Sequence, residues 1–224
     1  MPQTLTVAVC VSDEVTLSDF VTPMEILGGL NRKNMGEIPY RVQIDYLSPT
    51  MDPVVSMTGK LAATFNPTLT YTDALASGKQ FDIIWVPAGP LPNFATGDHR
   101  LPKDEIAFIA QQAPKAKYVM SVCGGTLQLA FAGVLAGKRA TTNKALYRQI
   151  VALVPKDVEW VPQARWVVDG NLWTSSGVAA GSDMALAFVE HLAGPQVARV
   201  IRGIMEIPEV TEKDDPFAVF HGLV

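Results

Sequence analysis

The sequence predicts an α/β fold with a mostly parallel central sheet between layers of helices. Short apolar runs rich in valine, at 5–11, 81–86 and 118–122, match strands that are covered on both faces. Segments with helical periodicity separate these runs, as the crossovers between parallel strands require. In such a sheet, the functional site is expected beyond the carboxyl ends of the strands.

The opening of the chain is expected to form a strand, a helix and a second strand. The run at 5–11 is the central strand, and 41–47 is the next one. Ser18 or Asp19 is a candidate cap for the helix between them, which is expected to end near Gly28, where glycine is favoured.

The middle of the chain places two loops at the carboxyl edge of the predicted sheet. The strand at 81–86 stops at the loop 87–90. The strand at 118–122 runs directly into a helix that opens at Gly124 and is expected to end at Gly137.

The remaining predicted elements are short. Strands are expected at 54–57, 61–64, 139–141, 158–160, 166–169 and 172–175, and helices at 103–113, 183–192 and 195–204. The first two of these strands are expected to pair as a hairpin. No linker or repeat divides the chain, so we expect one domain over residues 1–224.

Composition narrows the class of protein. The chain has 48% apolar residues, and its apolar runs fall short of the roughly 20 residues that a membrane helix needs. With no basic start typical of a secretory signal, the cytoplasm is the expected location. The net charge of −4 without a basic run argues against nucleic acid, and small molecules are the expected partners. No metal is expected, because no metal-ligand spacing occurs among the three histidines His99, His191 and His221.

The turn at Cys123 is the strongest candidate for a reactive site. The glycines after it permit a tight strand-to-helix path that lifts the thiol above the sheet edge. The helix start is expected to lower the thiol pKa below about 8.5 and to offer N–H groups to a developing negative charge. The alternative is a buried, inert cysteine. We favour the nucleophile for Cys123 and assign the inert role to Cys10, inside an apolar strand.

A cysteine nucleophile needs a partner that transfers protons, and no histidine lies in a predicted site loop. Asp19 begins the first helix at the same edge of the sheet as Cys123. Position alone leaves open whether Asp19 is that partner or only a helix cap. Asp183, near the start of a later helix, is interpreted as a cap or a structural charge.

Several motifs together give the chain a resemblance to a known family. They are LSDFVTPMEIL at 17–27, PAGP at 87–90, SVCGGT at 121–126, AGVLAGKRATT at 132–142, and GNLWT to GSD over 170–183. In this order they resemble the ThiJ/PfpI superfamily, a branch of the class I glutamine amidotransferase-like fold. The resemblance implies a flavodoxin-like three-layer sandwich with a nucleophile elbow, a homodimer, and no cofactor.

Within that superfamily the chain is most similar to the isocyanide hydratases, which pair the cysteine with an aspartate. The resemblance implies that Cys123 and Asp19 are catalytic and that Asp19 is hydrogen-bonded to the sulfur. The N–H groups of Gly89 and Gly124 are expected to stabilise charge on the adduct. The expected pocket-lining residues are Ala88, Gly177 and Val178.

Three positions depart from the family pattern. Gly124 stands where isocyanide hydratases often have threonine. Ala88 and Gly89 replace a pair of glycines that is common in the middle loop, and Asn143 stands where relatives often have histidine.

The implied function is hydration of an isocyanide to an N-substituted formamide by a lyase without a cofactor. A first alternative is a glyoxalase or another hydrolase or lyase that acts on a small electrophilic carbon. Glyoxalase-type members generally have histidine after the nucleophile and glutamate as partner, and neither is present here. A second alternative is a non-enzymatic sensor that responds to oxidation of Cys123.

Overall fold

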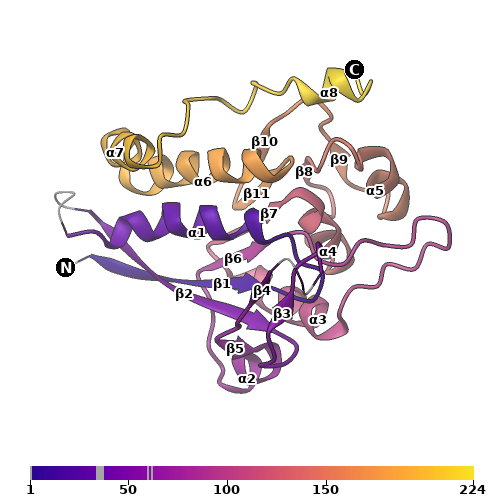
Figure 1. Ribbon diagram of the computed structural model, residues 1–224, viewed down its shortest axis with the longest axis horizontal. Coiled ribbons are helices and arrows are strands. Elements are labelled where there is room, and N and C mark those ends of the chain that lie inside the picture. The colour runs from indigo at the N-terminus through magenta and orange to yellow at the C-terminus, as the bar shows by residue number, and fades with distance from the viewer. Residues whose placement is uncertain (1, 34–37, 60, 62) are drawn as a thin grey trace.

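A seven-stranded, mostly parallel sheet forms the centre of the protein in the computed structural model, which describes residues 2–33, 38–59, 61 and 63–224 (Figure 1). The strand order is β10-β11-β7-β6-β1-β2-β5, and only the pair β10–β11 is antiparallel. The strands of this sheet are β1 (Gln3–Cys10), β2 (Tyr40–Ser48), β5 (Leu69–Thr70), β6 (Ile83–Val86), β7 (Tyr118–Val122), β10 (Trp166–Asp169) and β11 (Leu172–Ser175). The predicted α/β fold is confirmed.

Two small two-stranded sheets and eight α-helices complete the described part of the chain. The small sheets pair β3 (Val54–Val55) with β4 (Thr64–Phe65), and β8 (Arg139–Ala140) with β9 (Glu159–Trp160). The helices are α1 (Val21–Gly28), α2 (Tyr71–Ala76), α3 (Lys103–Gln112), α4 (Thr126–Phe131), α5 (Tyr147–Leu153), α6 (Val178–Ala193), α7 (Pro195–Met205) and α8 (Phe217–Phe220).

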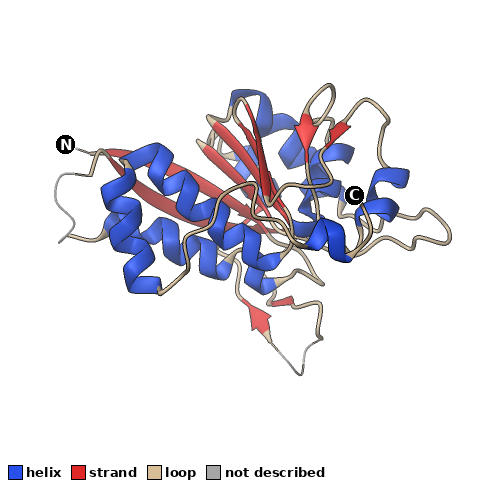
Figure 2. Cartoon of the chain, turned by 90° about the horizontal axis from the view of Figure 1, so that it is seen from above, coloured by secondary structure: helices blue, strands red, loops and turns tan. Residues whose placement is uncertain are grey.

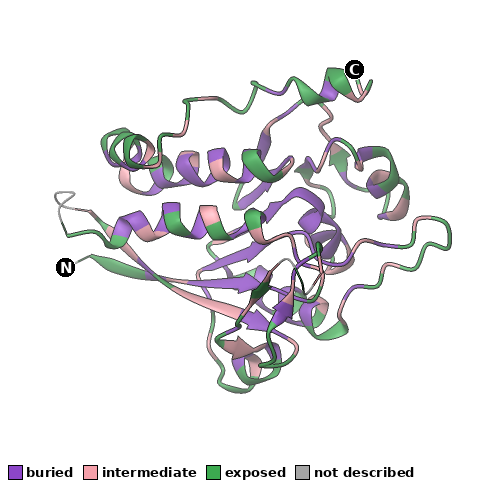
Figure 3. Ribbon diagram, viewed as in Figure 1, coloured by how far each residue is buried: buried purple, intermediate pink, exposed green. Residues whose placement is uncertain are grey.

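Helices cover both faces of the central sheet (Figures 1 and 2). The side chains of α1, α6 and α7 pack into one apolar cluster, and those of α2, α3 and α4 pack into a second. The alternation of β1 shows that the two clusters lie on opposite faces, because Val7 and Val9 belong to the first while Ala8 and Cys10 belong to the second. Cys10 is therefore a core residue, as predicted, and Figure 3 shows the sheet buried between the helices.

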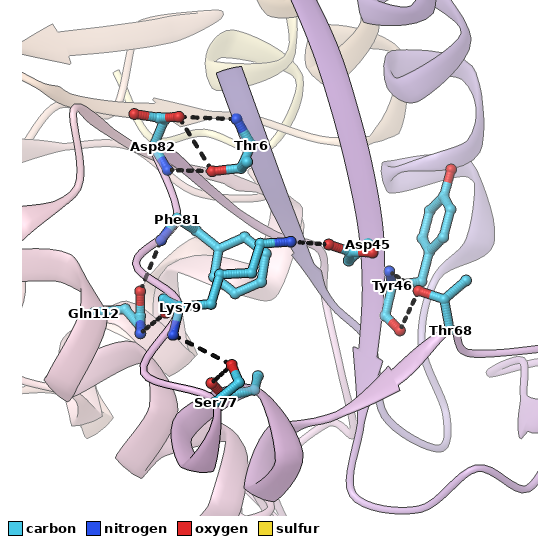
Figure 4. Close-up of polar contacts among 10 residues, drawn as sticks. Thr6, Asp45, Tyr46, Thr68, Ser77, Lys79, Phe81, Asp82 and Gln112 are labelled. Atoms are coloured by element: carbon cyan, nitrogen blue, oxygen red, sulfur yellow. Dashed lines mark hydrogen bonds and ion pairs between the residues drawn. The ribbon is translucent and has the colours of Figure 1, made fainter. Parts of the chain in front are cut away.

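Polar contacts fix the amino end of β6 (Figure 4). The carboxylate of Asp82 accepts hydrogen bonds from the backbone N–H of Thr6, at 2.9 Å, and from its hydroxyl, at 3.1 Å. At the end of α3, the Gln112 side chain accepts from the N–H of Phe81 at 3.0 Å. These contacts fix the register of β6 beside β1. They also fix the position of the loop 87–90, which follows the carboxyl end of β6.

Most predicted elements are present, and several of them differ in extent. The helix after Cys123 ends at Phe131 rather than Gly137, because the chain leaves the helix through Gly133 at a φ of 76°. Helix α6 begins at Val178, five residues before the prediction. The predicted hairpin pairs as β3 and β4, but positions 60 and 62 of its connection lie outside the described residues.

The start of α1 also differs from the prediction. A 3₁₀ turn over Leu17–Asp19 precedes the helix, Phe20 is the N-cap residue, and no side chain forms a cap hydrogen bond. Neither Ser18 nor Asp19 is the helix cap. Asp19 is left to bond elsewhere.

A close approach of two backbone segments constrains Gly125. A Cβ atom added there would lie 2.1 Å from the carbonyl oxygen of Val86. We expect Gly125→Ala to destabilise the protein by about 3 kcal/mol or more, because backbone on both sides must shift.

The matched control is Gly28→Ala in α1, where an added Cβ would have no heavy atom within 4 Å. It is expected to leave stability unchanged or raise it by about 0.5 kcal/mol. Urea denaturation of both variants measures the difference. Equal stability of the two would contradict the packing argument.

Candidate active site

Cys123 sits at a sharp turn between β7 and the 3₁₀ turn Cys123–Gly125 that leads into α4. Its φ of 59° lies in the left-handed region, where non-glycine residues are uncommon. The backbone is held there on both sides: its N–H donates to the carbonyl of Ser176 at 2.8 Å, and its own carbonyl accepts from the Thr142 hydroxyl at 2.8 Å. This is the geometry of a nucleophile elbow, at the carboxyl edge of the sheet.

Asn143 is the side chain that donates to the sulfur. Its Nδ2 lies 3.1 Å from Cys123 Sγ. Its Oδ1 accepts from the N–H groups of Ala145, at 2.9 Å, and Leu146, at 3.3 Å, so the amide is oriented with its donor toward the thiol. A negative charge that develops on sulfur is stabilised by this hydrogen bond.

Asp19 lies buried behind the middle loop. Its Oδ2 accepts from the N–H of Ala88 at 3.0 Å, while its backbone carbonyl accepts from the indole N–H of Trp85 at 3.0 Å. Its Oδ1 has no hydrogen-bond partner among the described residues. The predicted hydrogen bond between Asp19 and the sulfur is therefore wrong for this structure: Asp19 Oδ2 bonds to Ala88, Oδ1 has no described partner, and the side chain that bonds to the sulfur is Asn143.

Burial dominates the protonation of both groups. It raises the pKa of Asp19 from 3.8 to about 7, against the effect of the Ala88 hydrogen bond. Burial, and then the negative charge of Asp19, raise the pKa of Cys123 to about 12, while the hydrogen bonds from Asn143 and the Gly124 backbone act in the opposite direction. The prediction of a lowered thiol pKa is wrong, since the thiol is only 8% exposed and the helix that follows it has six residues.

The other predicted site residues fall into two groups. Gly124 follows the cysteine, and Gly89 in the middle loop lies beside the side chains of Ser12 and Gln128. Gly177 and Val178, at the start of α6, line a cavity of about 230 Å³ whose wall includes Asn143.

Asp183 lies inside α6 and not at its start. Its carboxylate forms an ion pair with Arg165, at 2.5 Å between Oδ2 and a guanidinium nitrogen. Asp183 is therefore a structural charge and not a helix cap, which were the two roles that the sequence left open.

A second buried acid lies behind the middle loop. Glu105 of α3 is fully buried, and burial raises its pKa from 4.5 to about 7, opposed by Ser12 and Gln128. The Gln128 amide donates to the carbonyl of Pro87 at 3.0 Å and lies 3.5 Å from Glu105 Oε1. Glu105 therefore contacts the loop that carries Ala88 and Gly89 indirectly, through the side chain of Gln128.

Other kinds of site receive no support from the described part of the chain. Within those residues, no three side chains among His, Cys, Asp and Glu are grouped so as to hold a metal ion. No helix there has both the length and the apolar character that crossing a membrane would take.

Most of the chain, including the elbow and Asp19, lies within a match to a known family. The model of the DJ-1/PfpI family matches residues 5–191. The chain belongs to the DJ-1/PfpI family. A solved structure of a ThiJ/PfpI family protein from Pseudomonas syringae superposes with a TM-score of 0.74 and 25% identity, covering 100% of this chain and 87% of that one.

Two enzymes of this family are similar in sequence. The chain is 37% identical to the isonitrile hydratase of Pseudomonas putida over 163 residues, which are 72% of this chain and 64% of that protein. It is 31% identical to a deglycase of Pyrococcus horikoshii over 125 residues, 56% of this chain and 69% of that one. The chain thus spans less than two thirds of the length of the isonitrile hydratase.

Two residues of the site, Asn143 and Glu105, have no role assigned to them by the sequence. Asn143 carried a signal, because it follows the matched segment 132–142 and replaces a common histidine. Glu105 carried another, since it shares the buried face of its helix with Phe108, Ile109 and Gln112. A carboxyl group at an apolar position of an amphipathic helix indicates a buried polar contact.

The raised pKa of Glu105 makes folding depend on pH. Between about 4.5 and 7 the folded state holds a proton that the unfolded state has lost, so this group's contribution to stability falls as pH rises. Replacing Glu105 by Gln removes that contribution, which is about 1.4 kcal/mol per pH unit at most. The free energy of unfolding is measured by urea denaturation at pH 5 and at pH 7. Its decrease from pH 5 to pH 7 is expected to be smaller for Glu105→Gln than for the natural protein.

Glu209→Gln, at an exposed position, is the control and is expected to follow the natural protein. An identical pH dependence for all three proteins would contradict a raised pKa at Glu105.

Proposed function

We propose that the protein is a cofactor-free isocyanide hydratase, a lyase that adds water to R–N≡C to give R–NH–CHO. The observation that carries this proposal is the pair formed by an elbow cysteine and a buried aspartate whose Oδ1 has no described partner. Such a pair can move one proton between sulfur, carbon and water without a metal or a histidine. The 37% identity to an isonitrile hydratase supports the same reaction.

In the first step, sulfur adds to the terminal isocyanide carbon. At neutral pH the thiol of Cys123 holds its proton, and Asp19, with a pKa of about 7, is available as the base. As the C–S bond forms, Asp19 accepts the thiol proton and then gives it to the same carbon. The product is the thioimidate Cys–S–CH=N–R, and Asp19 is a carboxylate again.

In the second step, Asp19 removes a proton from water as the oxygen adds to the thioimidate carbon. The substrate nitrogen takes up one proton, the C–S bond breaks, and the sulfur recovers the other, which releases the formamide. The Asn143 amide stabilises the sulfur as it leaves. The N–H groups of Gly89 and Gly124 are assigned to the negative charge that develops on the adduct.

The deglycase relative supports a second candidate, an activity on small dicarbonyl adducts at the same cysteine. A panel of aryl isocyanides and α-oxoaldehydes separates the two candidates. Oxidation of Cys123 without turnover of any substrate would instead favour the sensor.

The proposal extends to a homodimer in the cytoplasm, on the basis of the family resemblance. Light scattering of the purified protein tests the dimer: a monomer mass over the micromolar range would contradict it.

Cys123→Ala is expected to abolish hydration of an aryl isocyanide, because the covalent step is lost. Steady-state turnover measures this, and circular dichroism checks that the variant folds. Cys10→Ala, which alters the buried cysteine on the opposite side of β1, is the matched control and is expected to keep its turnover. Retention of turnover by Cys123→Ala would reject the nucleophile.

Asp19→Asn separates proton transfer from the other effects of the aspartate. The substitution keeps an acceptor for the Ala88 N–H but removes the base, so kcat/KM is expected to fall by about 10²- to 10⁴-fold. Iodoacetamide is expected to alkylate Cys123 faster at pH 8, since the negative charge that helps to raise the thiol pKa is gone.

The exposed Asp157→Asn is expected to change neither the turnover nor the alkylation rate. If Asp19→Asn retains most of its turnover, another group must transfer the proton.

A further inference from the structure

A cavity of about 230 Å³ adjoins the elbow, and two residues of the C-terminal segment 211–224 form part of its outer wall. Two of its inner residues bond directly to Cys123: Asn143 donates to the sulfur, and the carbonyl of Ser176 accepts from the Cys123 N–H. Phe217 and His221 supply the outer wall. Figure 1 shows the chain after α7 running back past α6 to reach this position at α8.

A buried ion pair fixes the C-terminal segment over the cavity. Lys144 Nζ lies 3.5 Å from Asp215 Oδ2, and the two side chains are 2% and 1% exposed. The other oxygen of Asp215 accepts from the backbone N–H of Phe217 at 3.0 Å. Lys144 follows Asn143 directly in the chain. The same turn therefore supplies the hydrogen bond to the sulfur and the ion pair that positions Asp215 and Phe217.

A second contact holds the end of this segment. The guanidinium of Arg148 in α5 donates to the carbonyl oxygens of His221, at 3.2 Å, and of Gly222. The outer wall is thus attached at both ends of α8. Its position is set by the fold.

The walls favour an uncharged, apolar occupant. Lys144 and Arg165 line the cavity, but their charges are paired with the carboxylates of Asp215 and Asp183. An anionic group would compete with these carboxylates at a net cost in desolvation. The remaining wall is mainly apolar, from Ala145, Val178, Ala179 and Phe217.

The size of the cavity sets the size of the group. A cavity of about 150 Å³ lined by apolar side chains accommodates benzene. The cavity beside Cys123, at about 230 Å³, has room for one aromatic ring and a short linker.

We propose that this cavity binds the nitrogen substituent of the isocyanide, an uncharged group of about one aromatic ring, and that Phe217 of the C-terminal segment sets its size limit. This assignment rests on the proposed reaction at Cys123. The isocyanide carbon lies at the sulfur, and its substituent extends past Asn143 and the start of α6.

Alkylation of Cys123 tests the cavity without requiring turnover. The rates of reaction with iodoacetamide and with its N-benzyl and N-naphthylmethyl derivatives are measured by mass spectrometry of the intact protein. Natural protein is expected to react with the naphthylmethyl probe more slowly than with the benzyl probe, relative to iodoacetamide. Phe217→Ala is expected to raise the naphthylmethyl-to-benzyl ratio about tenfold, by removing the wall that excludes the second ring.

Val219→Ala is the matched control, because Val219 lies on the same short helix and its side chain faces solvent at 62% exposed. It is expected to leave the ratio unchanged. An unchanged ratio in Phe217→Ala, or an equal change in both variants, would overturn the proposal.

Turnover of phenyl isocyanide by the natural protein is measured in parallel. If turnover is absent while the alkylation ratio shifts in Phe217→Ala, the isocyanide reaction fails and the cavity assignment stands for another electrophile. If turnover is present while the ratio does not shift, the cavity assignment alone fails.

Discussion

The left-handed backbone of Cys123 is the conformation on which the site depends. A residue with a Cβ pays about 1–2 kcal/mol to adopt it, so the surrounding structure must hold it in place. Ser176 accepts from its N–H, Thr142 donates to its carbonyl, and Gly125 lies against the carbonyl of Val86. These contacts come from the segment after β11, from the turn after β8, and from the end of β6. The elbow is therefore held in the folded protein by segments that are distant in the sequence.

The burial of Cys123 has opposite consequences for two possible roles of this residue, a redox sensor and a catalytic nucleophile. A redox sensor relies on an exposed thiolate, whereas burial and the charge of Asp19 raise the pKa of this thiol to about 12. A catalyst can begin from the neutral thiol if a base with a pKa near neutrality lies close by, and burial raises the pKa of Asp19 to about 7. The same burial that disfavours the thiolate of Cys123 raises the pKa of Asp19 to about 7. Catalysis is the better supported of the two roles.

The sequence predicted the elements of the sheet and the position of Cys123 because these depend on local patterns. Apolar runs and a Gly-Gly turn are visible over a few residues, and β1, β6 and β7 lie where they were expected. The thiol pKa was mispredicted because it depends on desolvation and on the distance to Asp19, which sequence position does not give. The role of Glu105 was not predicted for the same reason, since Gln128, the side chain within hydrogen-bond distance of it, comes from another helix.

Two departures from the family pattern, Ala88 and Gly124, are neighbours in space. A Cβ atom added at Gly124 would lie 3.3 Å from the Cβ of Ala88, which is closer than side chains ordinarily pack. The methyl group of Ala88 therefore limits the space for a side chain at position 124, which could be added only with a small shift of the middle loop. Because Ala88 also donates its N–H to Asp19, the residue at position 124 packs against the loop that holds the Asp19 carboxyl group.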